Sequence, residues 1–108
     1  MDISVTQNLL ATLSKCSEAC LSIDIEQLNP ALKTKSKRLT ELLKDCIELC
    51  NITESFVKRE SLHYKKMLKL CTEICFKTAE ELLKFGGVEF TKCYDICRIC
   101  AVECANAT

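Results

Sequence analysis

The sequence predicts an all-α fold: an antiparallel, up-down-up-down four-helix bundle with a cysteine-lined core, formed by residues 1–108 as a single domain. Three observations lead to this prediction. The 108 residues include two glycines and one proline, which leaves little material for β-turns. Apolar residues recur at alternating steps of four and three, the spacing of one helical face. A Cys-x-x-x-Cys motif lies on that face in each predicted helix.

The first predicted helix opens with a capping box over residues 4–7 and ends before Asn29. Its inward stripe is Leu9, Leu13, Cys16, Cys20, Ile23 and Gln27. The second predicted helix begins at Pro30, behind an Asn29 N-cap, and runs to about Lys58. Its stripe is Leu39, Leu43, Cys46, Cys50, Thr53 and Val57.

The third predicted helix has Ser61 as its N-cap and ends at the pair Gly86–Gly87, which separates it from the fourth. The stripe of the third helix is Tyr64, Leu68, Cys71, Cys75, Thr78 and Leu82. The stripe of the fourth is Phe90, Cys93, Cys97, Cys100 and Cys104. A 4-3-4 spacing is the seam of a helix that packs nearly parallel to its neighbours, so we expect all ten cysteines to point inward.

Cysteines four residues apart lie on one helical face, with Cβ atoms roughly 5–6 Å apart. Two such thiolates can hold a soft ion between them in a near-linear site, which suits Cu(I), whereas Zn²⁺ prefers four tetrahedral ligands. The predicted pairs are Cys16/Cys20, Cys46/Cys50, Cys71/Cys75, Cys93/Cys97 and Cys100/Cys104. Free cysteines also serve as small buried hydrophobic residues, but five pairs confined to seam positions favour metal binding.

The charge of the metal predicts how many ions such a core can take. Ten buried thiolates without cations would be too costly, and an equal number of Cu⁺ ions would neutralise them. Capacity could therefore approach one monovalent ion per thiolate. In the metal-free protein we expect neutral thiols, which pack as small hydrophobic groups.

Two further soft ligands precede Cys71 at steps of four. Met67 and His63 lie at the edge of the seam, because each step of four drifts by about 40° on a helix of 3.6 residues per turn. They are candidate metal ligands that could pass copper inward at the mouth of the bundle. The alternative is that Met67 fills the core and His63 is a solvated residue of the first turn.

Composition excludes several other classes of function. Lys+Arg and Asp+Glu balance at 15 each, which argues against nucleic acid or an anionic membrane as the partner. No apolar run is long enough to span a bilayer, and no secretory signal is visible before Lys15, so we expect a cytoplasmic protein with reduced thiols. With one histidine and no phosphate-binding loop, we find no active site and expect no enzyme.

The segment from Cys93 to Cys104 resembles the last helix of the cysteine-rich four-helix-bundle copper storage proteins. The segments 46–50 and 71–75 are similar to the second and third helices of that family. The resemblance implies a store of many Cu(I) ions with no enzymatic step, and association into homo-oligomers, often tetramers. Ile23, Thr53 and Thr78 stand where members of the family commonly have more cysteines, which implies a lower capacity.

Two other functions remain open from the residues. Cys-x-x-x-Cys pairs joined by disulfides also build helical-hairpin chaperones, in which the cysteines are structural. A zinc or iron–sulfur site in the same bundle is the third possibility. The copper donor and acceptor are unknown from the sequence.

Overall fold

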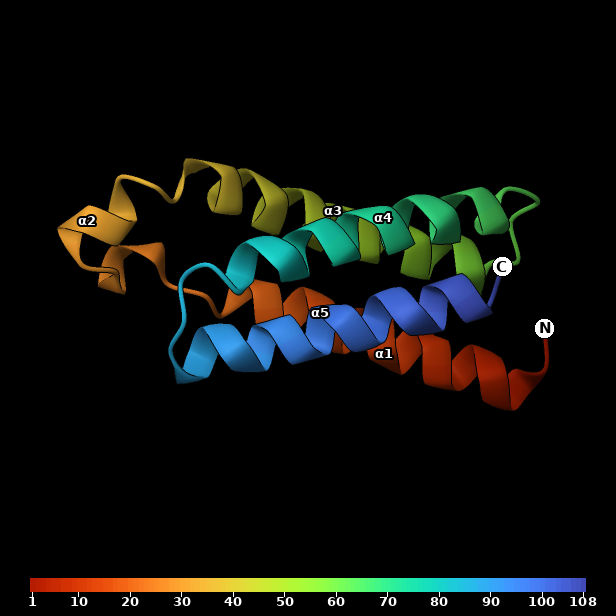
Figure 1. Cartoon of the computed structure of the whole chain (residues 1–108). Coiled ribbons are helices and arrows are strands. Elements are labelled where there is room, and N and C mark those ends of the chain that lie inside the picture. Colours follow the sequence, from red (N-terminus) through yellow and green to blue (C-terminus); the bar gives the residue numbers. More distant parts are fainter.

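The computed structural model describes residues 1–108 and contains four long helices in an antiparallel bundle, as the sequence predicts (Figure 1). The long helices are α1 (Ile3–Leu21), α3 (Lys37–Lys58), α4 (Tyr64–Leu82) and α5 (Val88–Asn106). A 3-10 turn, η1 (Ile25–Gln27), and a single helical turn, α2 (Pro30–Lys33), connect α1 to α3. The molecule measures 46 × 21 × 17 Å.

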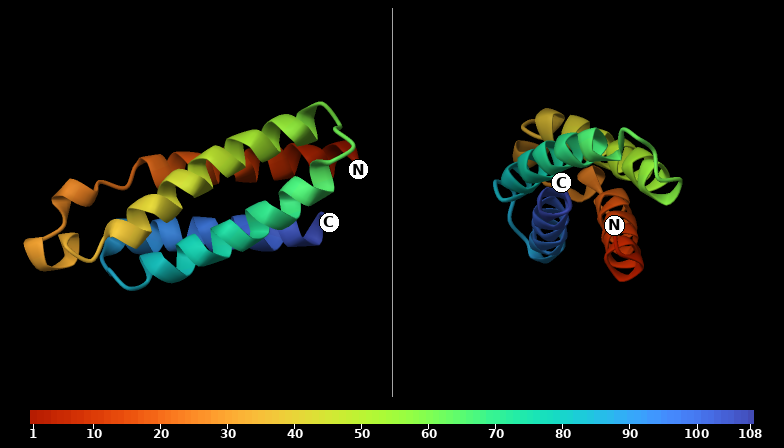
Figure 2. Two further views of the ribbon diagram at one scale, coloured as in Figure 1. Left: turned by 90° about the horizontal axis from the view of Figure 1, so that it is seen from above. Right: turned by 90° about the vertical axis from the view of Figure 1, so that its right-hand side faces the viewer.

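Each long helix packs against two neighbours. α1 and α4 lie diagonally opposite each other, and both contact α3 and α5. Both chain termini and the turn of residues 59–63 lie at one end of the bundle, which we call the terminal end (Figure 2). η1, α2 and the turn of residues 83–87 lie at the other end, which we call the α2 end.

α1 begins and ends earlier than the sequence indicates. Its N-cap is Asp2, whose carboxylate accepts a hydrogen bond from the Ser4 amide at 2.7 Å, so the predicted capping box is wrong. The helix ends at Leu21 rather than near Asn29. Asp24 caps η1 instead, accepting from the amide of Glu26 at 3.0 Å, and this places Gln27 outside the inward stripe.

The second predicted helix is interrupted, contrary to the single helix expected from Pro30 to Lys58. Asn29 does cap α2, as predicted, but α2 is one turn long. The hydroxyls of Thr34 and Ser36 donate to the carbonyls of Ala31 and Lys33, at 2.8 and 2.6 Å. Such local bonds compete with helix continuation, so α3 starts afresh at Lys37.

The remaining boundaries follow the sequence more closely. Ser61 caps the turn before α4 rather than the helix itself, because its hydroxyl accepts from the amide of His63, which occupies the N-cap position. Gly86 and Gly87 have φ values of +67° and +89°, conformations that side chains of L-residues rarely adopt. These two glycines end the α4 segment and allow α5 to turn back, as predicted.

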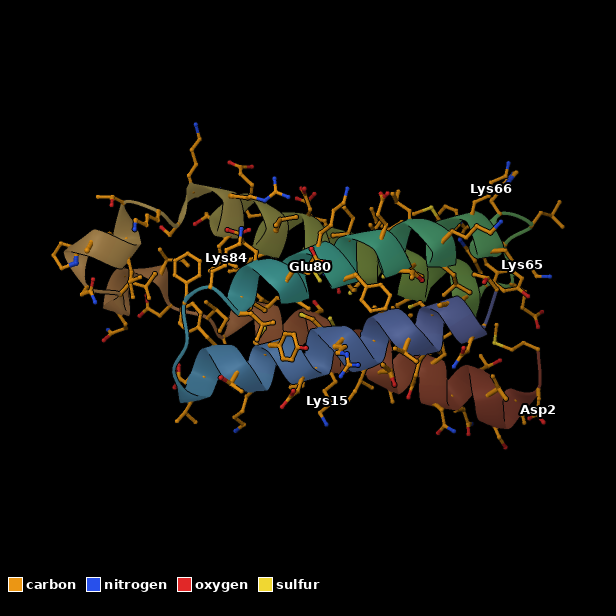
Figure 3. The ribbon with its side chains drawn as sticks, viewed as in Figure 1. Asp2, Lys15, Lys65, Lys66, Glu80 and Lys84 are labelled. Carbon is orange, nitrogen blue, oxygen red and sulfur yellow. The ribbon has the colours of Figure 1, made fainter.

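Apolar layers close both ends of the core. Leu9, Leu13 and Val57 are buried towards the terminal end, and Leu39, Leu82 and Phe90 are buried towards the α2 end, as predicted. Charged side chains such as Lys15, Lys66 and Glu80 project from the outer faces of the helices (Figure 3). The cysteines occupy the part of the core between the two apolar layers.

Candidate metal centre

Every cysteine lies in the core, which confirms the predicted inward seam. α1, α3 and α4 each contribute one Cys-x-x-x-Cys pair, and α5 contributes four thiols. No cysteine is more than 2% exposed, and all ten are free thiols. They are Cys16, Cys20, Cys46, Cys50, Cys71, Cys75, Cys93, Cys97, Cys100 and Cys104.

The sulfur atoms form one connected network. Sulfur–sulfur hydrogen bonds of 3.6–4.0 Å link every cysteine except Cys104. Cys75 lies at the centre, with the sulfurs of four other cysteines around it. Cys93 lies at one margin, bonded to Cys97 at 3.9 Å. Thiols at such short distances can share metal ions as bridging ligands.

Most of these contacts join different helices. Within a helix, sulfur hydrogen bonds form in two of the five predicted pairs, Cys71/Cys75 at 3.8 Å and Cys93/Cys97 at 3.9 Å. The other contacts cross between helices, the shortest being the 3.6 Å bond from Cys20 to Cys97. Antiparallel packing brings the seams of neighbouring helices to one level, so a thiol meets partners across the bundle as readily as along its own helix.

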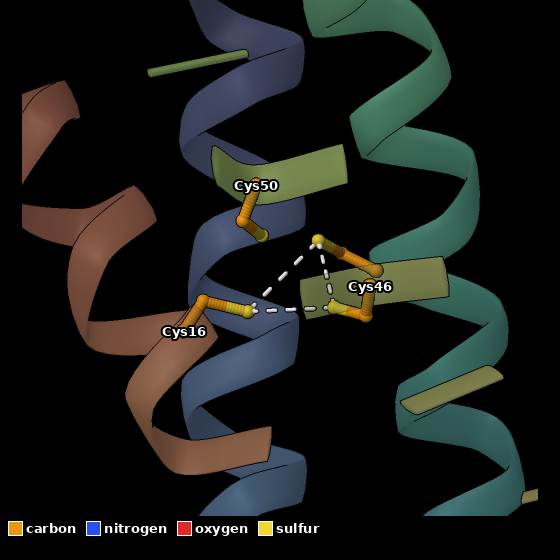
Figure 4. A group of neighbouring side chains, drawn as sticks. Cys16, Cys46 and Cys50 are labelled. Atoms are coloured by element: carbon orange, nitrogen blue, oxygen red, sulfur yellow. Dashed lines mark hydrogen bonds between the residues drawn. The ribbon is translucent and has the colours of Figure 1, made fainter. Parts of the chain in front are cut away.

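Three groups of four thiols have all sulfurs within 4.8 Å of one another. Figure 4 shows part of the central group, in which Cys16, Cys46 and Cys50 surround a common space. The central group is Cys16, Cys46, Cys50 and Cys75, and the outer groups are Cys16, Cys20, Cys46, Cys97 and Cys50, Cys71, Cys75, Cys100. The central group shares two thiols with each outer group, so ions held in the three groups would be joined through common ligands.

The environment affects the thiols unequally. Hydrogen bonds with Cys100 and other thiols, together with burial, raise the pKa of Cys75 above its ordinary value of 9.0. The pKa of Cys97 is raised in the same way, by Cys16 and then Cys20. By contrast, hydrogen bonds from Cys20 and Cys97 lower the pKa of Cys93 to about 5. The pKa values of Cys16, Cys46 and Cys71 are lowered as well. In the interior, thiols that stay protonated at neutral pH, such as Cys75 and Cys97, therefore lie beside thiols that favour the thiolate.

Two threonines stand on the seam next to the thiols. Thr53 and Thr78 are fully buried, at the positions where cysteines would extend the network. The hydroxyl of Thr78 donates to the carbonyl of Ile74 at 2.7 Å, whereas the hydroxyl of Thr53 has no partner. Ile23, the third such position, lies beyond the end of α1 and is half-buried.

The two predicted outer ligands lie at the terminal end. His63 is exposed just before α4, and Met67 is half-buried in its first turn. Leu68, the seam residue that precedes Cys71, is fully buried. Their role in metal binding stays a prediction.

The surroundings of Cys93 were not predicted. A groove of about 230 Å³ opens between α1 and α5 beside this cysteine, and we call it the Cys93 groove. Its lining is Ala19, Ser22, Glu89, Lys92, Cys93 and Ile96. Sequence spacing contains no signal for it, because its walls come from two helices that are far apart in the chain.

The thiol geometry differs from that of a disulfide-linked hairpin. Bonded sulfurs are about 2.05 Å apart. The shortest sulfur–sulfur distance among the hydrogen-bonded thiols is 3.6 Å. No helix of the chain combines the length and apolarity needed to cross a membrane.

Comparison with known proteins points to one family. Residues 3–108 match the family model described as copper storage protein. Searches of curated proteins and of solved structures found no match. The family match therefore covers nearly the whole chain, including all four long helices and all ten cysteines.

Proposed function

The chain belongs to the copper storage protein family, whose members are non-enzymatic metal stores, and we propose that residues 1–108 form one domain that stores several Cu(I) ions on its ten cysteine thiolates. The observation that carries the proposal is the connected sulfur network, in which four-thiol groups share members. Shared thiols suit bridging of many small, soft ions. Cys104 lies outside the hydrogen-bonded network, but it stands on the same seam of α5 and is fully buried, so we include it among the ligands.

Charge decides how many ions the core can hold. Metal binding replaces the thiol protons, so each Cu⁺ that displaces one proton leaves the net charge of the core unchanged. A buried core can therefore fill with Cu(I) up to about one ion per thiolate without accumulating charge, which burial would penalise. For ten thiols this sets the highest neutral loading at ten ions.

Zinc is the second candidate, because the thiol groups also fit its geometry. Four sulfurs around Zn²⁺ at 2.3 Å lie about 3.8 Å apart in a tetrahedron, close to the 3.6–4.0 Å contacts of the network. The two outer groups have no thiol in common, so they could hold two separate zinc ions. Each such site would carry two net negative charges in an apolar core, which disfavours zinc against Cu(I).

Location and assembly are further parts of the proposal. Free thiols at these distances favour a reducing compartment, and we place the protein in the cytosol. Homo-oligomers, with a tetramer as the expected form, are supported by apolar side chains on the outer face of α5, where Ile99 is 55% and Val102 is 43% exposed. Sedimentation of the metal-free and loaded protein would measure the assembly.

The decisive experiment is an anaerobic titration of the fully reduced protein with Cu(I) against a chromogenic chelator. We expect the protein to outcompete the chelator for several ions per chain, up to a plateau near the ten thiols. A parallel titration with Zn²⁺ should saturate at two ions or fewer. A Cu(I) plateau at one ion or none would refute the store.

A double substitution tests whether the network acts as a unit. Cys97 and Cys100 belong to different outer groups, so Cys97→Ser with Cys100→Ser disrupts both. We expect the number of Cu(I) ions bound per chain to fall by more than the fraction that two of the ten thiols represent. The matched control is Cys93→Ser with Cys104→Ser, which removes two thiols outside the four-thiol groups. Equal losses in the two variants would show that the sites are independent.

A further inference from the structure

Among the five main surface pockets, one alone is lined by a cysteine, and that is the Cys93 groove. Cys93 is 2% exposed, so its sulfur is recessed, and a slender ligand can reach it more readily than a folded protein surface can. The groove is large enough for part of a small molecule, at about 230 Å³.

Cys93 also begins a continuous path of sulfur atoms into the core. It contacts Cys97 at 3.9 Å, and Cys97 contacts Cys16 at 3.8 Å. From Cys16 the path continues to Cys46 at 3.7 Å and to Cys75 at 4.0 Å. An ion that binds at Cys93 can therefore reach the centre of the network by exchange between neighbouring thiols, with no step longer than 4.0 Å.

The terminal end offers no such path. A second groove lies between the same two helices there, also with a volume of about 230 Å³, and it is lined by Val5, Asn8, Leu9, Glu103, Asn106 and Ala107. None of these residues is a cysteine. On the α4 side, the first thiol, Cys71, is fully buried, and so is Leu68, the seam residue before it.

We propose that the Cys93 groove is the port through which Cu(I) passes between the thiol network and a small thiol that carries it, an inference that rests on the proposed storage of Cu(I). The groove connects the surface to Cys93, at the margin of the network. The sulfur contacts of the network then connect Cys93 to the four-thiol groups.

The transfer is a ligand exchange that balances without an oxidant or reductant. The Cys93 sulfur forms a bond to Cu(I), and one sulfur–copper bond of the carrier breaks. Cu(I) neutralises the charge of the Cys93 thiolate, the carrier sulfur leaves as a thiolate that takes up a proton from the solvent, and copper stays in the +1 state. Repetition of the exchange at Cys97 completes the release of the carrier and moves the ion inward.

The rim of the groove indicates the charge of the carrier. Glu89 and Lys92 are exposed, carry opposite charges and form no salt bridge within the chain. They can pair with the ammonium and carboxylate groups of a zwitterionic cysteine-containing peptide. Glutathione is the probe of this class, because it holds Cu(I) through its thiolate.

The test measures the rate of Cu(I) transfer from Cu(I)–glutathione to the full chain by anaerobic stopped flow, and the final capacity in the same samples. Ser22→Trp fills the Cys93 groove without removing a thiol, and Asn8→Trp fills the second groove as its matched control. Cys93→Ser and Cys104→Ser form a second pair, each of which removes one thiol outside the four-thiol groups.

We expect Ser22→Trp and Cys93→Ser to slow the transfer by about tenfold or more, because thiol exchange requires access to the attacking sulfur. Asn8→Trp should keep the wild-type rate, and Ser22→Trp should keep the wild-type capacity. Cys104→Ser should slow the transfer less than Cys93→Ser does, although each removes one thiol. Equal rates in all variants, or slowing by Asn8→Trp or His63→Ala instead, would overturn the port and leave the store intact. Failure of the wild-type chain to take up several ions would overturn the store itself.

A measurement on the unmodified chain avoids the possibility that a variant misfolds. Brief alkylation of the reduced, metal-free protein, followed by mass mapping, should label Cys93 before the fully buried thiols, such as Cys104. Labelling of Cys104 first would contradict the port.

Discussion

The two grooves between α1 and α5 differ in one respect that matters for metal transfer. Each has a volume of about 230 Å³, and each is lined by side chains from both helices. The groove towards the α2 end reaches Cys93, whereas the groove at the terminal end reaches Glu103 and Ala107 and leaves Cys104 covered. A surface opening therefore becomes a route to the core only where the cysteine seam approaches a gap between helices.

The comparison extends to the chemistry of the thiols. At the groove, the pKa of Cys93 is lowered to about 5 by hydrogen bonds from Cys20 and Cys97. In the interior, thiol hydrogen bonds and burial raise the pKa values of Cys75, Cys97 and Cys100. Other interior thiols, Cys16, Cys46 and Cys71, have lowered pKa values. The groove, rather than the direction of its pKa shift, is therefore what distinguishes Cys93.

The largest effect we expect concerns these interior thiols and the stability of the metal-free protein. A thiol whose pKa is raised on folding stabilises the protein fully below the unfolded value of 9.0 and loses this contribution as pH rises beyond it. Each such thiol should lower the free energy of unfolding by about 1.4 kcal/mol per pH unit above that value. Urea denaturation at a series of pH values from about 7 to about 10 measures the loss.

Cys93 contributes in the opposite sense, because its pKa is lowered on folding. Its stabilisation is present above pH 9.0 and is lost as pH falls towards about 5. Cys93→Ser should therefore retain the alkaline loss, and the copper-loaded protein should not show it, because its thiolates hold no protons. Constant stability of the metal-free protein through the alkaline range would be incompatible with protonated interior thiols.

A smaller effect comes from introducing a cysteine into the second groove, at the terminal end of the bundle. Ala107 lines that groove and follows Cys104 by three residues, so Ala107→Cys places two thiols on one face of α5 and its C-cap. In the Cys93→Ser protein we expect this change to raise the rate of Cu(I) transfer from glutathione about tenfold, because it restores an accessible attacking thiol.

The control for this gain is Ala107→Ser, which has a similar volume and no thiol. Equal transfer rates for Ala107→Cys and Ala107→Ser, both made in the Cys93→Ser protein, would break the comparison. In that event a thiol in a groove is not sufficient, and the charged rim formed by Glu89 and Lys92 would be a necessary part of the port.

The smallest effect separates the two seam threonines. Thr53 is fully buried with an unpaired hydroxyl, so Thr53→Val should stabilise the metal-free protein by about 1 kcal/mol, because it removes an unsatisfied polar group. Thr78 donates to Ile74, so Thr78→Val should destabilise it by a similar amount, about 1 kcal/mol. Thermal unfolding of both variants measures the difference, and effects of the same sign would rule out this explanation.

Several features were predictable because they depend on local spacing. The 4-3-4 recurrence of apolar residues and cysteines identified all four long helices, and Gly86–Gly87 identified the last turn. Boundaries were less predictable where polar side chains compete for the backbone. Asp24, Thr34 and Ser36 form local hydrogen bonds that end or interrupt helices, and the apolar pattern does not register them.

By itself, the sequence determined that ten cysteines share one seam and must face a common core, because helical periodicity decides which residues lie on one face. Only the tertiary structure decided which thiols meet. The 3.6 Å contact between Cys20 and Cys97 joins residues from α1 and α5, and the Cys93 groove is built from the same two helices. Both depend on the level at which antiparallel helices pack, a property of the whole core that no single helix contains.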